Sequence, residues 1–210
     1  DAAVLGGVAL YLYPAIDSIE RWAAVGIQRC FGDPMLKVNG LKAFADGSLG
    51  SSTALFFEPY AGAPAGEAPS ENRGLAQMDL APGGDLERKV RAAVEADLQL
   101  AIHAIGDRAI RSILDIYERA SRGAAGGAAG NAAAQRFRIE HAQHIHPDDI
   151  PRFARLGVIA SMQPYHAADD GRWAEKRIGA KRCDTTYAFR DLLASGAALA
   201  FGSDWPVAPL

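Results

Sequence analysis

The sequence predicts an α/β protein built around a parallel β-sheet. Three observations predict it: six apolar segments have strand length, amphipathic segments of helical period separate them, and the connections are short. The strand-length segments are continuous apolar runs, which is typical of strands buried on both faces of a parallel sheet. They comprise residues 8–13, 40–45, 98–104, 136–142, 158–163 and 198–203.

Helices are expected between these strands, over residues 18–30, 85–97, 107–122, 146–156 and 187–195. The apolar face of the third helix consists of Ile110, Ile113, Leu114 and Tyr117, at the 3.6-residue period of a helix. The fourth begins with Pro147 followed by two aspartates, a pattern typical of a helix N-terminus. Strands that alternate with helices indicate right-handed βαβ units, and therefore parallel strands.

Two architectures fit this alternation, an open doubly wound sheet and a closed (β/α)8 barrel. A nucleotide-binding doubly wound sheet has no support, because no strand is followed by GxGxxG and residues 50–53 lack the lysine of a phosphate-binding loop. Residues 123–134 are rich in glycine and alanine, and we expect a flexible low-complexity insertion there. The Gly/Pro-rich residues 62–74 are expected to form a long loop.

The composition is that of an average globular domain. The 210 residues include 22 Lys+Arg and 25 Asp+Glu, a net charge of −3, with 49% hydrophobic and 22% charged residues. This balance excludes a disordered chain and offers no basic stripe for nucleic acid. The apolar runs are far shorter than the roughly 20 residues of a membrane span. No secretory signal is visible, so we expect a cytoplasmic protein, and Cys30 and Cys183 lack CxxC spacing, which favours free thiols.

Ionisable residues lie at or near the ends of four predicted strands. They are Lys42, His103, His141 and Asp204. In a parallel α/β fold the carboxyl ends of the strands carry the chemistry, and imidazole nitrogens and carboxylate oxygens are ligands of divalent metals such as zinc. A lysine within an apolar strand is costly as an ammonium ion, but it is tolerable when deprotonated, paired, or converted by CO2 into an anionic carbamate. Each residue alone also fits a structural role, such as a hydrogen-bonded core histidine.

Three further histidines follow predicted strands. His144 and His146 stand in a loop, where side chains do not alternate regularly, and we expect them to support a site or face solvent. His166 lies at the edge of the predicted sheet, where it either touches substrate or is a plain surface residue. The charged residues 169–170 and 175–177 are expected on a solvated, mobile loop.

Several motifs resemble those of the amidohydrolase superfamily of metal-dependent hydrolases. They are KAFADGSLGSST (residues 42–53), IHAIGDRAI (102–110), RIEHAQH (138–144), IASMQP (159–164) and FGSDWPV (201–207). In this order they are most similar to amidohydrolase family 3, which includes the N-substituted formamide deformylase-like proteins. The resemblance implies a partial (β/α)8 TIM barrel with a metal site at its C-terminal face. The six predicted strands would then be strands three to eight.

The resemblance also implies a function and a site. The function is hydrolysis of a carbon–nitrogen bond that is not a peptide bond, in a small amide, N-formyl or N-acyl compound. The implied cofactor is zinc or another divalent metal, as one or two ions held by Lys42, His103, His141 and Asp204, with Lys42 possible as a carbamate. Asp204 would act as general base and then general acid on a metal-activated water, and His141 would hold the metal or polarise the carbonyl. Substrate contacts are expected from Asp46, Gln143, Gln163 and His166.

The sequence departs from this family in one respect, which leaves alternatives open. No HxH pair precedes residue 42, although the superfamily carries one on its first strand, and six strands cannot close an eight-stranded barrel. We therefore expect an incomplete barrel, one domain over residues 1–210, that is inactive alone. One alternative is a pseudoenzyme that serves as an interaction module. Another is a metal-free barrel lyase with Lys42 as a Schiff-base amine and His103 as acid or base. The oligomeric state is not indicated.

Overall fold

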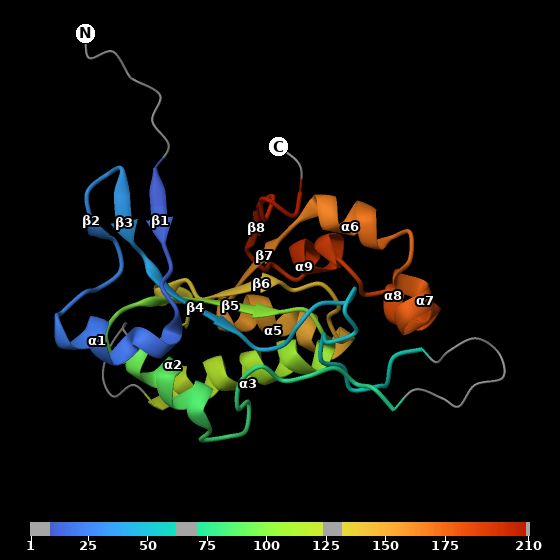
Figure 1. The fold of residues 1–210 in the computed structure, drawn as a ribbon, viewed down its shortest axis with the longest axis horizontal. Helices are drawn as coiled ribbons and strands as arrows, with labels where there is room; N and C mark the ends of the chain where they lie inside the picture. The colour runs from blue at the N-terminus through green and yellow to red at the C-terminus, as the bar shows by residue number, and fades with distance from the viewer. Residues whose placement is uncertain (1–8, 62–70, 124–131, 209–210) are drawn as a thin grey trace, which may run out of the picture.

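The computed structural model describes residues 9–61, 71–123 and 132–208. Its centre is a five-stranded parallel sheet in the order β4-β5-β6-β7-β8, so that neighbours in space are neighbours along the chain (Figure 1). The strands are β4 (Gly40–Phe44), β5 (Gln99–Ala104), β6 (Arg138–His141), β7 (Ile159–Met162) and β8 (Leu199–Phe201). This order confirms the predicted partial (β/α)8 barrel and five of its six expected strands.

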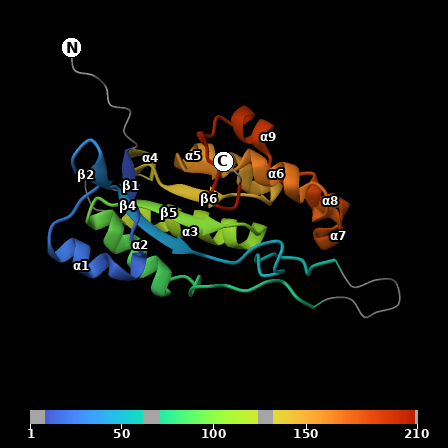
Figure 2. The same ribbon diagram turned by 45° about the horizontal axis from the view of Figure 1, so that its top comes forward.

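Helices connect these strands, as the sequence predicts. Between successive strands lie α2 (Asp85–Glu95), α3 (Asp107–Gly123), α5 (Ile150–Leu156) and α9 (Phe189–Ala194). A single 3-10 turn, η3 (Pro147–Asp149), precedes α5, and the short α4 (Ala132–Gln135) follows α3. Helices α2 and α3 lie side by side along one side of β4 and β5 (Figures 1 and 2). All the strands therefore point the same way, and their carboxyl ends lie along one edge of the sheet.

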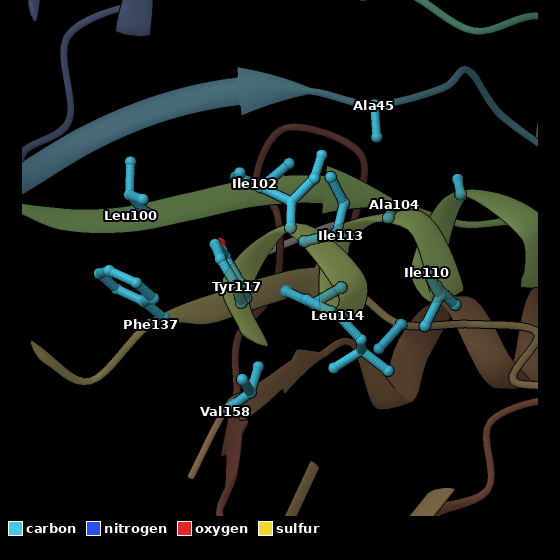
Figure 3. Close-up of a cluster of buried hydrophobic side chains, with 14 of the residues drawn as sticks. Ala45, Leu100, Ile102, Ala104, Ile110, Ile113, Leu114, Tyr117, Phe137 and Val158 are labelled. Atoms are coloured by element: carbon cyan, nitrogen blue, oxygen red, sulfur yellow. The ribbon is translucent and has the colours of Figure 1, made fainter. Parts of the chain in front are cut away.

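The main hydrophobic core lies between the sheet and helix α3 (Figure 3). The predicted apolar face of α3, namely Ile110, Ile113, Leu114 and Tyr117, has no exposed area. It packs with Leu100 and Ile102 of β5 and with Phe137 just before β6. Consecutive residues of β5 are buried, so both faces of this strand are covered, whereas Phe44 at the end of β4 and Phe201 at the end of β8 are exposed.

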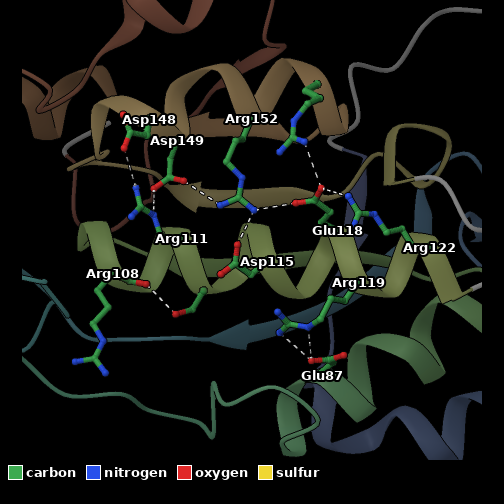
Figure 4. Close-up of polar contacts among 12 residues, drawn as sticks. Glu87, Arg108, Arg111, Asp115, Glu118, Arg119, Arg122, Asp148, Asp149 and Arg152 are labelled. Atoms are coloured by element: carbon green, nitrogen blue, oxygen red, sulfur yellow. Dashed lines mark hydrogen bonds and ion pairs between the residues drawn. The ribbon is translucent and has the colours of Figure 1, made fainter.

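The outer sides of the helices are joined by charged side chains (Figure 4). Arg152 of α5 contacts Asp115 and Glu118 of α3 at 2.6 and 3.1 Å, and Asp149 at 2.9 Å. Glu87 of α2 accepts from Arg119 of α3 at 2.8 Å. Helix α3 is thus held to the sheet by its apolar face and to its neighbours by its polar face.

The first predicted strand, over residues 8–13, does not join the central sheet as expected. Its described part forms β1 (Leu10–Leu12), which pairs with β3 (Leu36–Val38) in a separate sheet of order β1-β3-β2, where β2 is Phe31–Gly32. Pro14 follows β1 and has no N–H with which to continue a ladder. Beside β4 the chain makes a single bridge, in which Lys42 N–H donates to the Pro14 carbonyl at 2.8 Å.

Other segments also differ from the predictions. The expected helix over residues 18–30 is the shorter α1 (Ile19–Ala24), preceded by the 3-10 turn η1 (Ile16–Ser18), and it ends because Gly26 takes a left-handed φ of 70°. Of the predicted insertion 123–134, residues 124–131 lie outside the described residues, while residue 123 and residues 132–134 are helical. Within the loop 62–74, residues 62–70 likewise lie outside the described residues.

The expected mobile loop around residues 169–177 is helical instead. It contains α6 (Pro164–Asp170), α7 (Ala174–Ile178) and the adjoining α8 (Ala180–Cys183). Pro164 at the first helical position suits the start of α6, and Ala174 and Ile178 bury the inner side of α7. Cys30 and Cys183 are both free thiols, as expected. Among the described residues, no helix has the length and apolarity needed to cross a bilayer.

Candidate active site at the carboxyl ends of the strands

The four strand-end residues singled out in the sequence line one cavity of about 470 Å³, named here the strand-end cavity. Lys42, His103, His141 and Asp204 all contribute to its wall, together with Gln143 and His166. They converge because the carboxyl ends of the parallel strands meet at one edge. Ladder pairing puts Phe44 beside His103 and Ala104 beside His141, so the strand ends are level with each other.

Three of these side chains form a tight group. One ligand atom each from His141, His166 and Asp204 lies within 4.8 Å of the others. The rings of His141 and His166 are stacked, with centroids 6.1 Å apart and planes inclined by 16°. His141 is buried and Asp204 is exposed, so the group lies at the edge of the sheet with one side open to solvent and to a ligand.

His141 is held in one tautomer. Its Nδ1–H donates to Gln163 Oε1 at 2.9 Å, which leaves Nε2 with an unprotonated lone pair. Burial lowers the pKa of His141, although the Asp204 carboxylate acts in the opposite direction. His141 and Ala142 have φ values of 73° and 45°, a left-handed backbone that costs about 1–3 kcal/mol per residue outside glycine. The chain therefore turns sharply at the residue that carries the imidazole.

His103 lies beside this group with one nitrogen already committed. Its Nε2–H donates to the Gly47 carbonyl at 2.9 Å, and the ring centroid is 4.6 Å from that of His141. Burial and the nearby His141 lower the pKa of His103 to about 4. The imidazole is therefore neutral at physiological pH, with a lone pair on Nδ1.

Lys42 supplies the amine of the cavity. Burial lowers the pKa of Lys42, and the negative charges of Glu140 and Asp204 offset this only in part. Its Nζ lies 5.0 Å from the centre of the Phe44 ring. Reaction with CO2 requires an unprotonated amine, so a lowered pKa favours the carbamate that the resemblance implies.

Asp46 is a buried carboxylate that accepts from three backbone N–H groups and lies 3.5 Å from His103 Nε2. Oδ1 accepts from Ile105 N–H at 3.0 Å, and Oδ2 accepts from Gly106 and Leu55 N–H at 2.8 Å each. Burial raises the pKa of Asp46 to about 7, against the three N–H groups that lower it. These contacts tie the loop after β4 to the end of β5, and the substrate-binding role of Asp46 stays a prediction.

The two predicted glutamines are both buried against protein groups. Gln163 orients His141, as described above, while Gln143 Nε2 donates to Asp170 Oδ2 at 2.7 Å and to the Tyr187 hydroxyl. Tyr187 also donates to Asp170 Oδ2 at 2.6 Å. Their roles in binding substrate also stay predictions. Asp170 and Tyr187 are site-supporting residues that the sequence analysis missed, since they are 17 residues apart and neither follows a strand directly.

His144 and His146 lie outside the strand-end cavity. Both line a second cavity of about 500 Å³, which also contains Arg111 and Arg182. His144 Nδ1–H donates to Thr186 Oγ1 at 2.8 Å, and burial, together with the charge of Arg182, lowers the pKa of His144 to about 3. This placement is consistent with the expectation that His144 and His146 support a site or face solvent and do not themselves bind a metal.

Comparison with known proteins identifies the class of protein. Residues 10–210 match the amidohydrolase family, and the chain belongs to that family. Two uncharacterized metal-dependent hydrolases of known structure, from Pyrococcus furiosus and Pyrococcus horikoshii OT3, are 29% and 31% identical in sequence and superpose with a TM-score of 0.78 each. Each comparison covers 96% of this chain, but 38% and 36% of the respective neighbour.

Relatives in plants and bacteria share the same region. The protein LONG AFTER FAR-RED 3 of Arabidopsis thaliana is 45% identical over 176 residues, 83% of this chain and 28% of that protein. The putative amidohydrolase YtcJ of Bacillus subtilis strain 168 is 32% identical over 194 residues, 92% of this chain and 33% of that protein. The chain thus spans about a third of the length of these curated relatives. Family membership supports a hydrolase, and the metal-dependent neighbours support a divalent metal.

Proposed function

We propose that the protein containing this chain hydrolyses a carbon–nitrogen bond in a small amide, N-formyl or N-acyl compound. The observation that carries the proposal is the convergence of His141, His166 and Asp204 at the carboxyl ends of parallel strands, in a member of the amidohydrolase family. This is the edge of a parallel α/β fold where chemistry is expected.

The donor set fits a divalent metal. It offers imidazole nitrogens and a carboxylate oxygen, which are the ligands that zinc takes, and the open side toward solvent leaves room for water or substrate. Within the described part of the chain, His166 Nε2 is a buried atom with no hydrogen-bond partner. When bound, zinc or a similar ion would acidify a water and polarise a carbonyl. Lys42 as a carbamate would add an anionic ligand, whose two oxygens would also serve a second ion.

The remaining roles belong to side chains of the cavity. Asp204 takes a proton from the attacking water and later delivers it to the leaving nitrogen, because its carboxylate is exposed and lies beside His141. Gln163 fixes the His141 tautomer, so that its Nε2 lone pair stays available. His103 is neutral, and its hydrogen bond to the Gly47 carbonyl fixes its ring beside His141 in the wall of the cavity.

The test uses the full-length protein and a panel of N-formyl and N-acyl amides, with matched esters as comparison substrates. Asp204→Asn should lower kcat at least 100-fold, the lower end of what a general base contributes, while some metal remains bound. Asp184→Asn, which removes a carboxylate from the second cavity, is the control and should retain activity. Wild-type turnover in Asp204→Asn would remove this residue from the mechanism. Failure of every amide to react would favour an interaction module.

The lowered pKa of Lys42 also suits a second function, a metal-free lyase in which the amine forms a Schiff base with a carbonyl substrate. Two measurements separate the functions. Chelation should abolish hydrolysis by a metal enzyme, whereas a Schiff-base enzyme retains activity and is trapped covalently at Lys42 by borohydride.

A further inference from the structure

His166 has an unusual environment for a residue on a short helix near the surface. Its ring is half-buried, and Nε2 is among the few buried side-chain atoms of the described residues that have no hydrogen-bond partner. An imidazole nitrogen buried without a partner loses its interaction with water and gains nothing in return. The position of this nitrogen therefore points to a partner that binds from the cavity.

The surroundings of His166 favour a cation as that partner. The other two ligand atoms within 4.8 Å belong to the neutral His141 and the carboxylate Asp204, which both offer lone pairs. His144 Nε2 is also buried without a partner, but the charge of Arg182 acts on it and disfavours a cation there. Among the described residues, the bare nitrogen of His166 belongs to a close group with a carboxylate oxygen and a second imidazole, and His144 belongs to no such group.

The helix that carries His166 is fixed from the opposite end. Asp170, one turn later on α6, accepts hydrogen bonds from the Tyr187 hydroxyl at 2.6 Å and from Gln143 Nε2 at 2.7 Å. Both donors come from other segments, so α6 is joined to the loops after β6 and before α9. These hydrogen bonds fix the helix so that the ring of His166 lies nearly parallel to the ring of His141.

We propose that His166 is a direct ligand of the divalent metal, together with His141 and Asp204. The inference rests on the metal site of the proposed function and deepens it. It adds His166 to the ligand set implied by family resemblance, which leaves His166 to the substrate. The reason is geometric: His166 Nε2 is buried without a hydrogen-bond partner and lies within 4.8 Å of a ligand atom of His141 and of Asp204.

The test replaces the zinc or other native ion of the full-length protein with Co²⁺, whose thiolate complexes absorb in the near ultraviolet. His166→Cys should create a thiolate-to-cobalt absorption band, because the new sulfur replaces the ligand nitrogen. The matched control is His146→Cys, a histidine of the second cavity, which should give no band beyond that of the wild-type protein. Cobalt bound to His166→Cys without the band would overturn the proposal.

Equilibrium dialysis against Co²⁺ gives a second measurement that does not depend on activity. His166→Gln should weaken cobalt binding at least tenfold, because even the loss of a residue that only hydrogen-bonds to a metal ligand weakens binding by about that factor. His146→Gln should retain wild-type affinity. A smaller loss contradicts direct ligation. Asp204→Asn separates the two proposals: if it weakens binding and His166→Gln does not, only the assignment of His166 is wrong. If neither variant weakens binding, the metal site of the proposed function is itself wrong.

Discussion

Glu87 gives the sharpest stability prediction, because it is a buried carboxylate that holds two helices together. It is 3% exposed, and it accepts from Arg91 at 2.7 Å, from Arg119 at 2.8 Å and from Gly83 N–H at 3.0 Å. Burial alone would raise the pKa of Glu87, but the hydrogen bonds from Arg119, Gly83 and Arg91 outweigh it and lower the pKa from 4.5 to about 2.

Glu87→Gln removes the charge and leaves a neutral amide group facing the two guanidinium groups of Arg91 and Arg119. At about 1.36 kcal/mol per pH unit, the lowered pKa corresponds to about 3.4 kcal/mol at neutral pH. The side chains of Arg119 and Arg91 are 34% and 41% exposed, so solvent screening reduces this, and we expect a loss of about 2 kcal/mol in the free energy of unfolding.

Urea unfolding at several pH values tests the reasoning. A lowered folded-state pKa stabilises the protein above the unfolded pKa of about 4.5, and this contribution disappears as the pH falls through about 2. The difference between wild type and Glu87→Gln should therefore be largest at pH 7 and shrink steadily below pH 4.5. Glu95→Gln, an exposed glutamate of the same helix, should change stability by less than about 0.5 kcal/mol. Equal stability at pH 7, or a difference independent of pH, would refute the argument.

Three further substitutions test the core and the support of the site. Leu114→Ala removes a fully buried side chain from α3, and should cost about 2–5 kcal/mol in thermal unfolding; an unchanged melting temperature would mean that α3 is not packed as described. Tyr117→Phe removes the hydroxyl that donates to the Arg138 carbonyl at 3.0 Å, and should lower the free energy of unfolding in urea by about 1–2 kcal/mol. Unchanged stability would mean that the loss of this hydrogen bond is compensated, for example by water. Gly106→Ala places a Cβ against the Leu55 carbonyl oxygen, so the backbone that Asp46 holds must shift; we expect lower stability and weaker metal binding by dialysis, and wild-type values for both would contradict the close approach.

The sequence predicts local structure well where one period dominates. The apolar face of α3 follows from its helical period, because that period determines which side chains share a face. The extent of the apolar runs places His103 and His141 at the ends of β5 and β6, whereas Lys42 lies in the middle of β4. The pairing of β1 with β3 could not be predicted in this way. It depends on Pro14 ending one ladder and on a partner strand of three residues, which is too short for a periodic signal.

The environment of His166 also lay beyond the sequence. Its place depends on α6, and α6 is held by contacts of Asp170 with Gln143 and Tyr187, 27 and 17 residues away along the chain. No local pattern encodes such contacts. Asp46 shows the same limit: its spacing correctly places it after β4, but not the return of the backbone at residues 105–106 that surrounds its carboxylate.

The hydrogen-bond directions at His141 and His103 have a consequence for what can approach the cavity. Each imidazole donates its one proton to a protein oxygen, Gln163 Oε1 in one case and the Gly47 carbonyl in the other. Each therefore retains a nitrogen that can only accept, and Asp204 adds a further acceptor. These three side chains together present lone pairs to the cavity, which favours a cation or another electron-poor ligand and disfavours an anion beside them. The Gly47 carbonyl and Gln163 Oε1 thus influence which charge a ligand of the cavity should carry, because they fix the proton on each imidazole without contacting the ligand themselves.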